Sequence, residues 1–452
     1  MAMQDLKLRL DYGTDGLAVE LPGDRATVIE PAHVPPVPDP AATLIHALRS
    51  PIGKRPLREV VRSGQTVGIS VCDITRAQPR KVMIEALFSE MPGVRMEDVT
   101  IFIATGTHRR NTDEEIERML GCEIARRCRI VCHNARDNAS LTHVGNTSTG
   151  VRVLLNRDWV NSDFKITTGF VEPHFFAGFS GGPKMVAPGL AGIETVMTLH
   201  DVTRIGHPNA TWGVTEGNPV HDDVREIARM TGVDFALDVT LNRDQKITAA
   251  FAGDLLLEHA AACALSKKIV MRPVKEPFDV VVTTNSGYPL DQNLYQAVKG
   301  MSAAAKVVKA GGTIICASEC RDGIPNHGAY GEILASCSSP RELLDMITGS
   351  GYSRPDQWQV QIQAQIQLKA KVLVKSDCLS ETQIRQAHFE PVSDVAAAAV
   401  EALRSAGPDA TLCVLPQGPQ TIPYLKTEES AGLMTARSSW NPGTTGAHRN
   451  CE

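Results

Sequence analysis

Long apolar runs, paired cysteines and an excess of basic charge are all missing from this 452-residue sequence. No apolar run reaches the ~18–20 residues that cross a bilayer, which argues against a membrane protein. The 11 cysteines contain no CxxC pair, so we expect reduced thiols and not a disulfide framework. Because 46 basic residues are outnumbered by 51 acidic ones, the net charge is -5, and a strongly basic nucleic-acid-binding protein is excluded.

Aromatic residues are also few, at 5%, whereas 36 glycines and 27 prolines are present. Many glycines in a chain of this length are typical of tight loops between strands and helices. The first residues, MAMQDLKLRLDYGTDG, lack the apolar core of a signal peptide, and we therefore expect a cytoplasmic protein.

Alternation of apolar and polar residues predicts short antiparallel strands within residues 6–29. From residue 41 the pattern changes to short β-branched runs that alternate with amphipathic helices. Such runs are typical of buried strands in a mostly parallel sheet with helices on both faces. The strands expected in this part of the chain are residues 66–72, 99–106, 128–133 and 163–170.

A second α/β unit is expected further along the chain. A strand at 278–285, a helix at 291–308 and a strand at 311–318 are predicted to form a βαβ unit. We therefore predict an α/β fold with two α/β domains, mostly parallel sheets and an active-site cleft between the domains.

The predicted boundary lies near residue 270, in a stretch that contains two prolines. Residues 1–270 are expected to form a cofactor-binding and catalytic domain, and residues 271–425 a substrate-binding domain. Residues 426–452 are polar and small, and we expect a disordered tail there.

Four segments that follow predicted strands carry reactive side chains, and ligands of α/β sheets bind at the carboxyl ends of strands. In the first segment, Asp73, Thr75 and Arg76 suit a sugar hydroxyl and a phosphate, but a simple Asp–Arg loop clasp explains them equally well. In the second, His108 follows a glycine turn and is placed like a general base, although a solvated loop histidine is the simpler explanation.

The third segment, EPHFFAGFSGGPKM at residues 172–185, is a glycine-rich loop that ends near Lys184. It is not a phosphate-binding loop, because Pro183 interrupts the Gly-Lys step and Met185 replaces the magnesium-binding hydroxyl. The nearby phenylalanines favour a lysine with a lowered pKa that acts as a nucleophile; the alternative is an exposed lysine on a flexible loop. Further on, His200 is either a metal ligand, with Asp201 or a backbone carbonyl orienting its other ring nitrogen, or an ordinary helix-end histidine.

The fourth segment opens a predicted helix in the second domain. Tyr295 and Gln296 lie four and three residues before Lys299, so both neighbour it on a helix surface. A phenol, an amide and an ammonium group suit a small carboxylate, whereas a solvated lysine on an amphipathic helix is the simpler alternative. The joint occurrence of the four segments favours one functional site over four separate structural explanations.

Together these motifs resemble the lactate racemase family that uses the nickel-pincer nucleotide. The resemblance extends from the N-terminal strands to about residue 415, and its two longest stretches make it specific. The matching features are DxTR at 73–76, TGxHR at 105–109, PHxxAGFSGGxKM at 173–185, a histidine sixteen residues after Lys184, and GYPLDQNxYQAVKGM at 287–301.

The resemblance implies a role for each residue of these motifs. The cofactor, Ni(II)-pyridinium-3,5-bisthiocarboxylate mononucleotide, would be tethered to Lys184 and its nickel completed by His200. His108 and His174 would be the acid–base residues, and cofactor-biosynthesis proteins would load the enzyme. The implied nucleotide-binding residues are Asp73, Ile74, Thr75 and Arg76, and the implied substrate-binding residues are Tyr295, Gln296, Lys299 and Trp358.

The implied activity is racemisation or epimerisation of a 2-hydroxy acid, either lactate or a close relative. One histidine takes the hydroxyl proton while a hydride passes from Cα to the cofactor, and its return to either face gives either enantiomer. Malate, an aromatic lactate and a sugar acid are alternative substrates.

Two other functions stay open at this point. A zinc hydrolase can be built on His108, His174 and His200, but the sequence contains no HExxH motif. The second alternative is a non-catalytic protein whose two domains close on a small anion.

Overall fold

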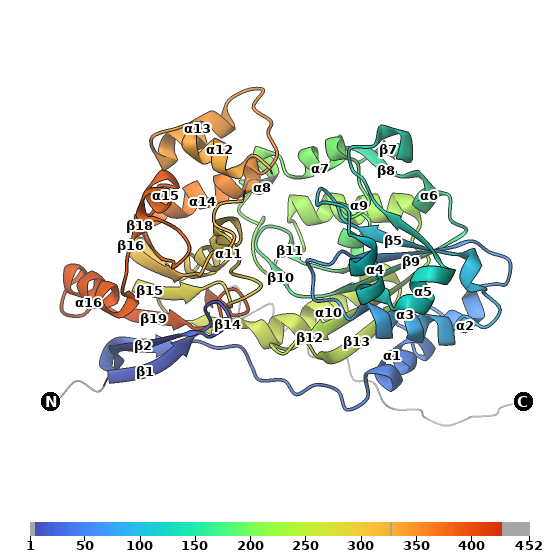
Figure 1. The fold of residues 1–452 in the computed structure, drawn as a ribbon, viewed down its shortest axis with the longest axis horizontal. Helices are drawn as coiled ribbons and strands as arrows, with labels where there is room; N and C mark the ends of the chain where they lie inside the picture. Colours follow the sequence, from blue (N-terminus) through green and yellow to red (C-terminus); the bar gives the residue numbers. More distant parts are fainter. Residues whose placement is uncertain (1–4, 326–327, 427–452) are drawn as a thin grey trace, which may run out of the picture.

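Two six-stranded sheets, each at the centre of its own α/β unit, organise the chain (Figure 1). The structure is a computed structural model that describes residues 5–325 and 328–426. The predicted α/β class and the two mostly parallel sheets are confirmed. The predicted disordered tail falls almost entirely on residues 427–452, which lie outside the described residues.

The first sheet has the strand order β13-β12-β9-β4-β5-β6, and every pair is parallel except β12 with β13. Strands β4 and β9 are buried along their whole length. β4 is accordingly a largely apolar run, whereas β9 also buries Lys165, Thr167 and Thr168. The strands are β4 Val67–Cys72, β5 Val99–Ala104, β6 Arg129–Cys132, β9 Phe164–Phe170, β12 Phe235–Leu241 and β13 Ile247–Gly253.

Helices cover this sheet, and side-chain caps start several of them. Asn218 caps α9 and Asp254 caps α10, each through two backbone N–H groups. The helices of the first unit are α1 Pro40–Arg49, α2 Leu57–Val60, α3 Arg80–Ser89, α4 Asp113–Leu120, α5 Cys122–Arg127, α6 Arg157–Val160, α7 Ile193–Leu199, α8 Val202–Ile205, α9 Pro219–Thr231 and α10 Leu255–Val270.

The second sheet is parallel throughout, with the order β18-β17-β16-β15-β19-β3. Its strands are β3 Ala26–Val28, β15 Phe278–Thr284, β16 Val308–Ala317, β17 Lys371–Lys375, β18 Glu390–Pro391 and β19 Leu412–Leu415. Its helices are α11 Leu294–Ala304, α12 Tyr330–Ala335, α13 Pro340–Thr348, α14 Gln357–Lys369, α15 Glu381–Gln386 and α16 Val395–Ala406.

The N-terminal strands depart from the prediction. β1 (Asp5–Leu10) and β2 (Leu17–Pro22) form the expected antiparallel hairpin, but β3 pairs in parallel with β19. Leu10 shares a hydrophobic cluster with Val280 of β15, and Figure 1 shows the blue hairpin beside the second sheet. The antiparallel direction predicted for β3 is therefore wrong, and these strands accompany the second unit although we grouped them with residues 1–270. Alternation reveals which face is buried, but not which distant strand is the partner.

Short two-stranded pairings complete the fold. They are β7 (Leu141–Asn146) with β8 (Arg152–Asn156), β10 (Pro173–His174) with β11 (Gly178–Phe179), and β14 (Met271–Val274) with β20 (Ile422–Leu425). Within the described ranges, no helix is long and apolar enough to cross a membrane.

One hydrophobic cluster runs across both units. It contains Phe175, Phe176 and Trp212 from the first unit together with Val298 and Trp358 from the second. Helix α14 packs directly on α8, and Figure 1 shows these helices at the junction of the two units. The units are therefore in contact beside the loops that carry the predicted site residues.

Candidate active site

The loops after β4, β5 and β9 meet because these strands are parallel neighbours in the first sheet. Asp73 directly follows β4, and His108 and His174 each lie four residues beyond the ends of β5 and β9. The His108 Nδ1 atom is 2.6 Å from Asp73 Oδ2. The structure thus joins the first two segments that the sequence singles out.

Asp73 is almost fully buried and holds the ring of His108. Its Oδ1 accepts hydrogen bonds from the backbone N–H and the hydroxyl of Thr75, at 3.0 and 2.5 Å. Burial by itself would raise the pKa of Asp73, but the hydrogen bond and charge of His108, with Arg76 nearby, lower it to about 2. Asp73 is therefore a carboxylate at neutral pH that accepts the Nδ1–H of His108, which leaves His108 Nε2 as a proton acceptor.

His174 packs against the rings of Phe175 and Phe176. Its ring packs 5.0 Å from Phe175 and 4.5 Å from Phe176 between centroids, and its Nδ1 accepts a hydrogen bond from the backbone N–H of Ala177 at 3.3 Å. Burial, reinforced by the charge of Lys184 and other nearby cations, lowers the pKa of His174 well below its usual value. The imidazole is therefore neutral at physiological pH and fixed in orientation.

Lys184 lies in a tight turn, and its amine forms no ion pair among the described residues. Its Nζ lies 5.8 Å from the ring centroid of Phe176 and makes no hydrogen bond within residues 5–325 and 328–426. Burial lowers the pKa of Lys184 to about 7, and the charges of Arg76 and Lys299 act in the same direction. A large fraction of the amine is therefore uncharged at neutral pH, which is the form that reacts as a nucleophile.

His200 is a buried imidazole in the tautomer that binds metals. Its Nδ1–H donates to the backbone carbonyl of Val196 at 2.7 Å, so the lone pair is on Nε2. Burial lowers the pKa of His200 to about 4, and the bond to Val196 only partly opposes this. Of the two orienting groups that the sequence suggests, the backbone carbonyl holds His200, and Asp201 instead pairs with Arg204.

The ring of Phe176 connects these groups. Besides its contacts with His174 and the Lys184 amine, it packs edge-on against His200 with 5.2 Å between centroids. Residues from three parts of the first unit therefore converge on one aromatic side chain.

The second unit contributes α11 and α14 to the same place. Trp358 packs 4.8 Å from His200 between ring centroids, and its Nε1–H donates to the Tyr295 hydroxyl at 3.1 Å. Lys299 Nζ lies 5.9 Å from the ring centroid of Phe175. Gln296 is partly buried in the first turn of α11, one position after Tyr295.

Positive charge dominates this region. Burial lowers the pKa of Lys299 to about 8, and the charge of Arg76 lowers it further. Arg76 and Thr75 are exposed and polar, whereas Ile74 packs against the core of the first unit and offers no polar group. Clustered cations of this kind suit an anionic ligand such as a phosphate or a carboxylate.

Glu172 is a charged member of the cluster that sequence reasoning missed. Its side chain is partly open to solvent; the loss of water around the carboxyl group raises its pKa, and the charges of Lys299, Arg76 and Lys184 oppose that shift. The only signal in the sequence is its position two residues before His174, which does not distinguish it from any loop glutamate.

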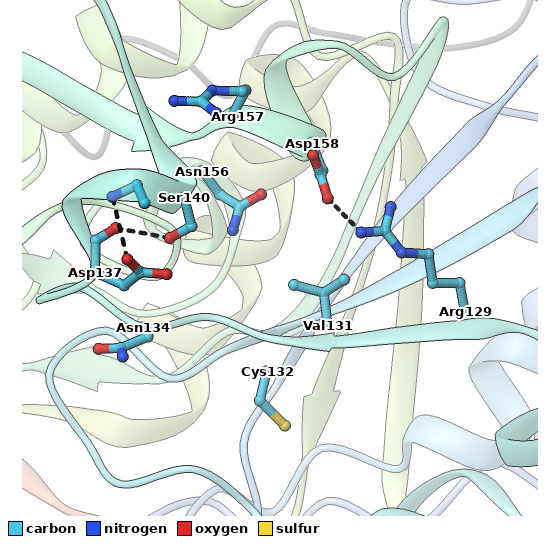
Figure 2. A pocket seen from close by; sticks show the side chains of 10 residues that line it. Arg129, Val131, Cys132, Asn134, Asp137, Ser140, Asn156, Arg157 and Asp158 are labelled. Atoms are coloured by element: carbon cyan, nitrogen blue, oxygen red, sulfur yellow. Dashed lines mark hydrogen bonds and ion pairs between the residues drawn. The ribbon is translucent and has the colours of Figure 1, made fainter.

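Two surface hollows lie away from these residues. The first, of about 420 Å³, is lined by side chains that include Arg129, Asn134 and Asp158, and Figure 2 shows the ion pair between Arg129 and Asp158 at its rim. The second, of about 390 Å³, lies beside the N-terminal hairpin. Neither contains a residue of the predicted site, and the cleft between the domains stays a prediction.

The zinc alternative does not fit the geometry. Among the described residues, no three His, Cys, Asp or Glu side chains are grouped so that they can hold a metal ion. His108, His174 and His200 therefore form no zinc site of their own.

Comparison with known proteins shows the family of the chain. Residues 12–213 match the lactate racemase N-terminal domain, and residues 274–422 match the lactate racemase C-terminal domain. The chain belongs to the lactate racemase family. It is a 2-hydroxy acid racemase, and the prediction from the sequence motifs is confirmed at that level.

Known lactate racemases align with most of the length of this racemase. The lactate racemase of Thermoanaerobacterium thermosaccharolyticum is 33% identical over 421 residues, which are 92% of this chain and 98% of that protein. The lactate racemase of Lactiplantibacillus plantarum is 36% identical over 379 residues, 83% of this chain and 89% of that one. The solved lactate racemase apoprotein from Thermoanaerobacterium thermosaccharolyticum superposes with a TM-score of 0.86 at 31% identity, covering 93% of this chain and all of that one.

The contact between Asp73 and His108 gives a first prediction. Changing Asp73 to asparagine is expected to lower kcat about tenfold or more, because an amide no longer holds the hydrogen of His108 on Nδ1. Steady-state racemisation by chiral chromatography measures the effect. Asp98→Asn, which alters a partly exposed carboxylate paired with Arg95 away from the site, is the matched control. An unchanged kcat in the Asp73 variant would show that His108 works without this contact.

Proposed function

We propose that this racemase interconverts the enantiomers of lactate or a close relative with a nickel-pincer nucleotide bound through Lys184. The observation that carries the proposal is the single aromatic ring, Phe176, that contacts Lys184, His200 and His174 together. An attachment point, a metal ligand and an acid–base group are thereby within reach of one small planar molecule.

The side chains fit this cofactor. The Lys184 amine is uncharged in part at neutral pH and has no protein partner among the described residues to displace. His200 presents a free Nε2 lone pair, and imidazole with soft sulfur ligands suits nickel. Arg76 and Thr75 are exposed polar groups at the end of β4, where a nucleotide phosphate would be held.

The chain's own residues have three tasks in this reaction. When bound, the nickel-pincer nucleotide would take up the Cα hydrogen as a hydride and give it back. His108, with its Nε2 lone pair, accepts the proton of the substrate hydroxyl. His174, whose Nδ1 accepts from Ala177, would perform the same task for the opposite enantiomer in its other tautomer, with the proton on Nδ1 in place of that hydrogen bond and the lone pair on Nε2. The aromatic side chains around His174 and His200 exclude water and keep the 2-keto acid from escaping.

Lys299 and Gln296 would hold the substrate carboxylate from α11. Changing Lys299 to methionine is expected to raise KM about 10- to 100-fold with a smaller effect on kcat, because a charge-assisted hydrogen bond contributes about 1.5–3 kcal/mol. Lys299→Arg, which keeps the charge, should recover part of the loss. Equal KM values for wild type and Lys299→Met would remove Lys299 from the substrate site.

The substrate is tested with loaded protein and a panel of single enantiomers. Lactate, malate, phenyllactate and a sugar acid are each followed by loss of optical rotation. We expect lactate or a close homologue to racemise fastest. If protein with a verified cofactor racemises none of them, the non-catalytic anion-binding alternative becomes the better account.

A further inference from the structure

The turn that carries Lys184 packs on a buried platform formed by Asp238 and His259, with Glu258 beside Asp238. The Gly182 backbone N–H donates to Asp238 Oδ2 at 2.6 Å, and His259 Nε2–H donates to the Ser180 carbonyl at 2.8 Å. Asp238 comes from β12 and His259 from α10. Neither residue contacts Lys184 through its side chain, so the platform acts on the backbone of the turn.

The Gly181–Lys184 turn packs tightly against Asp238 and His259. Gly181 and Gly182 have φ values of +71° and +49°, a region that other residues avoid. A Cβ atom on Gly182 would overlap the ring of His259, and one on Gly181 would lie 2.9 Å from Asp238 Oδ2. The backbone of the turn is therefore pressed against these two side chains.

Two carboxyl groups lie in this platform without a cation to balance them. Asp238 is 1% exposed and Glu258 is 0% exposed. Both carboxyl oxygens of Glu258 have no hydrogen-bond partner in the described part of the chain, and besides Gly182 only the backbone N–H of Gly169 lies near the Asp238 carboxyl group. Burial raises the pKa of Asp238 to about 7, and burial together with the charge of Asp238 raises that of Glu258 well above its usual value. The pair therefore keeps at least one proton, and Glu258 is its neutral member.

Buried polar atoms without hydrogen-bond partners lower the free energy of unfolding of the protein. Destabilising groups of this kind are found mostly at functional sites. The functional element in contact with the platform is the turn from Gly181 to Lys184.

We propose that Asp238, with Glu258 behind it, is a positioning residue that fixes the Gly181–Lys184 turn and thereby keeps the Lys184 amine out of water and reactive. This proposal rests on the proposed function, because the reactivity of Lys184 matters only if Lys184 is the attachment point. Glu258 keeps a neutral carboxyl group beside Asp238, so that Asp238 stays the acceptor for Gly182.

Asp238 affects the Lys184 amine by keeping it buried. The charged and titratable groups that interact electrostatically with Lys184 are Arg76, Lys299, Glu172 and Cys72, together with the imidazoles of His174, His200, His221 and His259. Burial is the largest cause of its lowered pKa. If the turn is released, the amine gains water, its pKa rises toward the ordinary value, and the uncharged fraction at pH 7 falls tenfold for each pKa unit.

The test uses unloaded full-length protein and trace labelling with acetic anhydride. The acetylation rate of Lys184 is measured by peptide mass spectrometry as a function of pH, relative to the exposed Lys246 in the same sample. Asp238→Ala is expected to slow labelling of Lys184 at pH 7 about tenfold or more. Asp238→Asn, whose amide oxygen still accepts from Gly182, is expected to label like wild type, as is Glu258→Gln.

The proposal is overturned if Asp238→Ala labels at the wild-type rate, or if Asp238→Asn is as slow as Asp238→Ala. If the alanine variant does not fold, amide hydrogen exchange of wild type decides: the Gly182 N–H must be among the protected amides, and fast exchange there contradicts the proposal. Labelling does not involve the cofactor. Failure of the proposed function would appear separately, as wild-type protein that carries no added mass on Lys184.

Discussion

Racemisation by the Lys184→Ala variant is expected to fall to the rate of the uncatalysed reaction. Removing the amine removes the attachment point, and catalysis would be lost together with the bound nickel. The fold should survive, because the Lys184 side chain makes no hydrogen bond within the described residues and its removal relieves repulsion with Arg76 and Lys299. Racemisation, nickel content and intact mass are measured on protein made with the cofactor-biosynthesis pathway.

The intact mass of the protein distinguishes covalent attachment of the cofactor at Lys184 from other roles of this lysine. Wild-type protein should exceed its sequence mass, with the increment on the peptide that contains Lys184, and the alanine variant should show none. Lys184→Arg keeps a positive charge and should be equally inactive, whereas Lys246→Ala, at an exposed turn, should behave like wild type. Full activity in Lys184→Ala would remove this lysine from the mechanism.

His108→Ala and His174→Ala are each expected to lower kcat about 10²- to 10⁴-fold while nickel stays bound, since general acid–base groups contribute on that scale. Two enantiomers have equal free energy, so kcat/KM must fall by the same factor in both directions. Differences between the directions can appear only in kcat and KM separately. His143→Ala, at an exposed strand position, is the matched control.

The two variants also test the roles assigned to each ring. If one variant keeps near-native rates in both directions, that histidine is structural only. If either variant loses nickel, the loss of rate does not report proton transfer, and the nickel content of every preparation therefore accompanies its rate. Effects on the double variant need not add, because both groups act in one reaction.

Several parts of this account follow from the sequence. Short runs rich in apolar and β-branched residues predict β4, β5 and β9, although β9 also carries Lys165 and two threonines. Reactive residues after parallel strands predict a shared edge, and the contact between His108 and Asp73 agrees with it.

Other parts depend on contacts that no local pattern reveals. The parallel pairing of β3 with β19 joins segments from opposite ends of the chain. The platform of Asp238, Glu258 and His259 comes from elements whose polar residues resemble solvated positions until the fold buries them.

The central claim is that the Cα hydrogen leaves and returns as a hydride, and its isotope tests this most directly. Loaded protein racemises one enantiomer of 2-deuterated lactate, or of the best substrate in the panel, in ordinary water. Mass spectrometry then reads the deuterium content of both separated enantiomers. We predict that deuterium remains at Cα in the product, because a hydride held in a closed site does not exchange with solvent. Replacement of the deuterium by hydrogen from water would show that a side chain removes the Cα hydrogen as a proton, and would contradict the account.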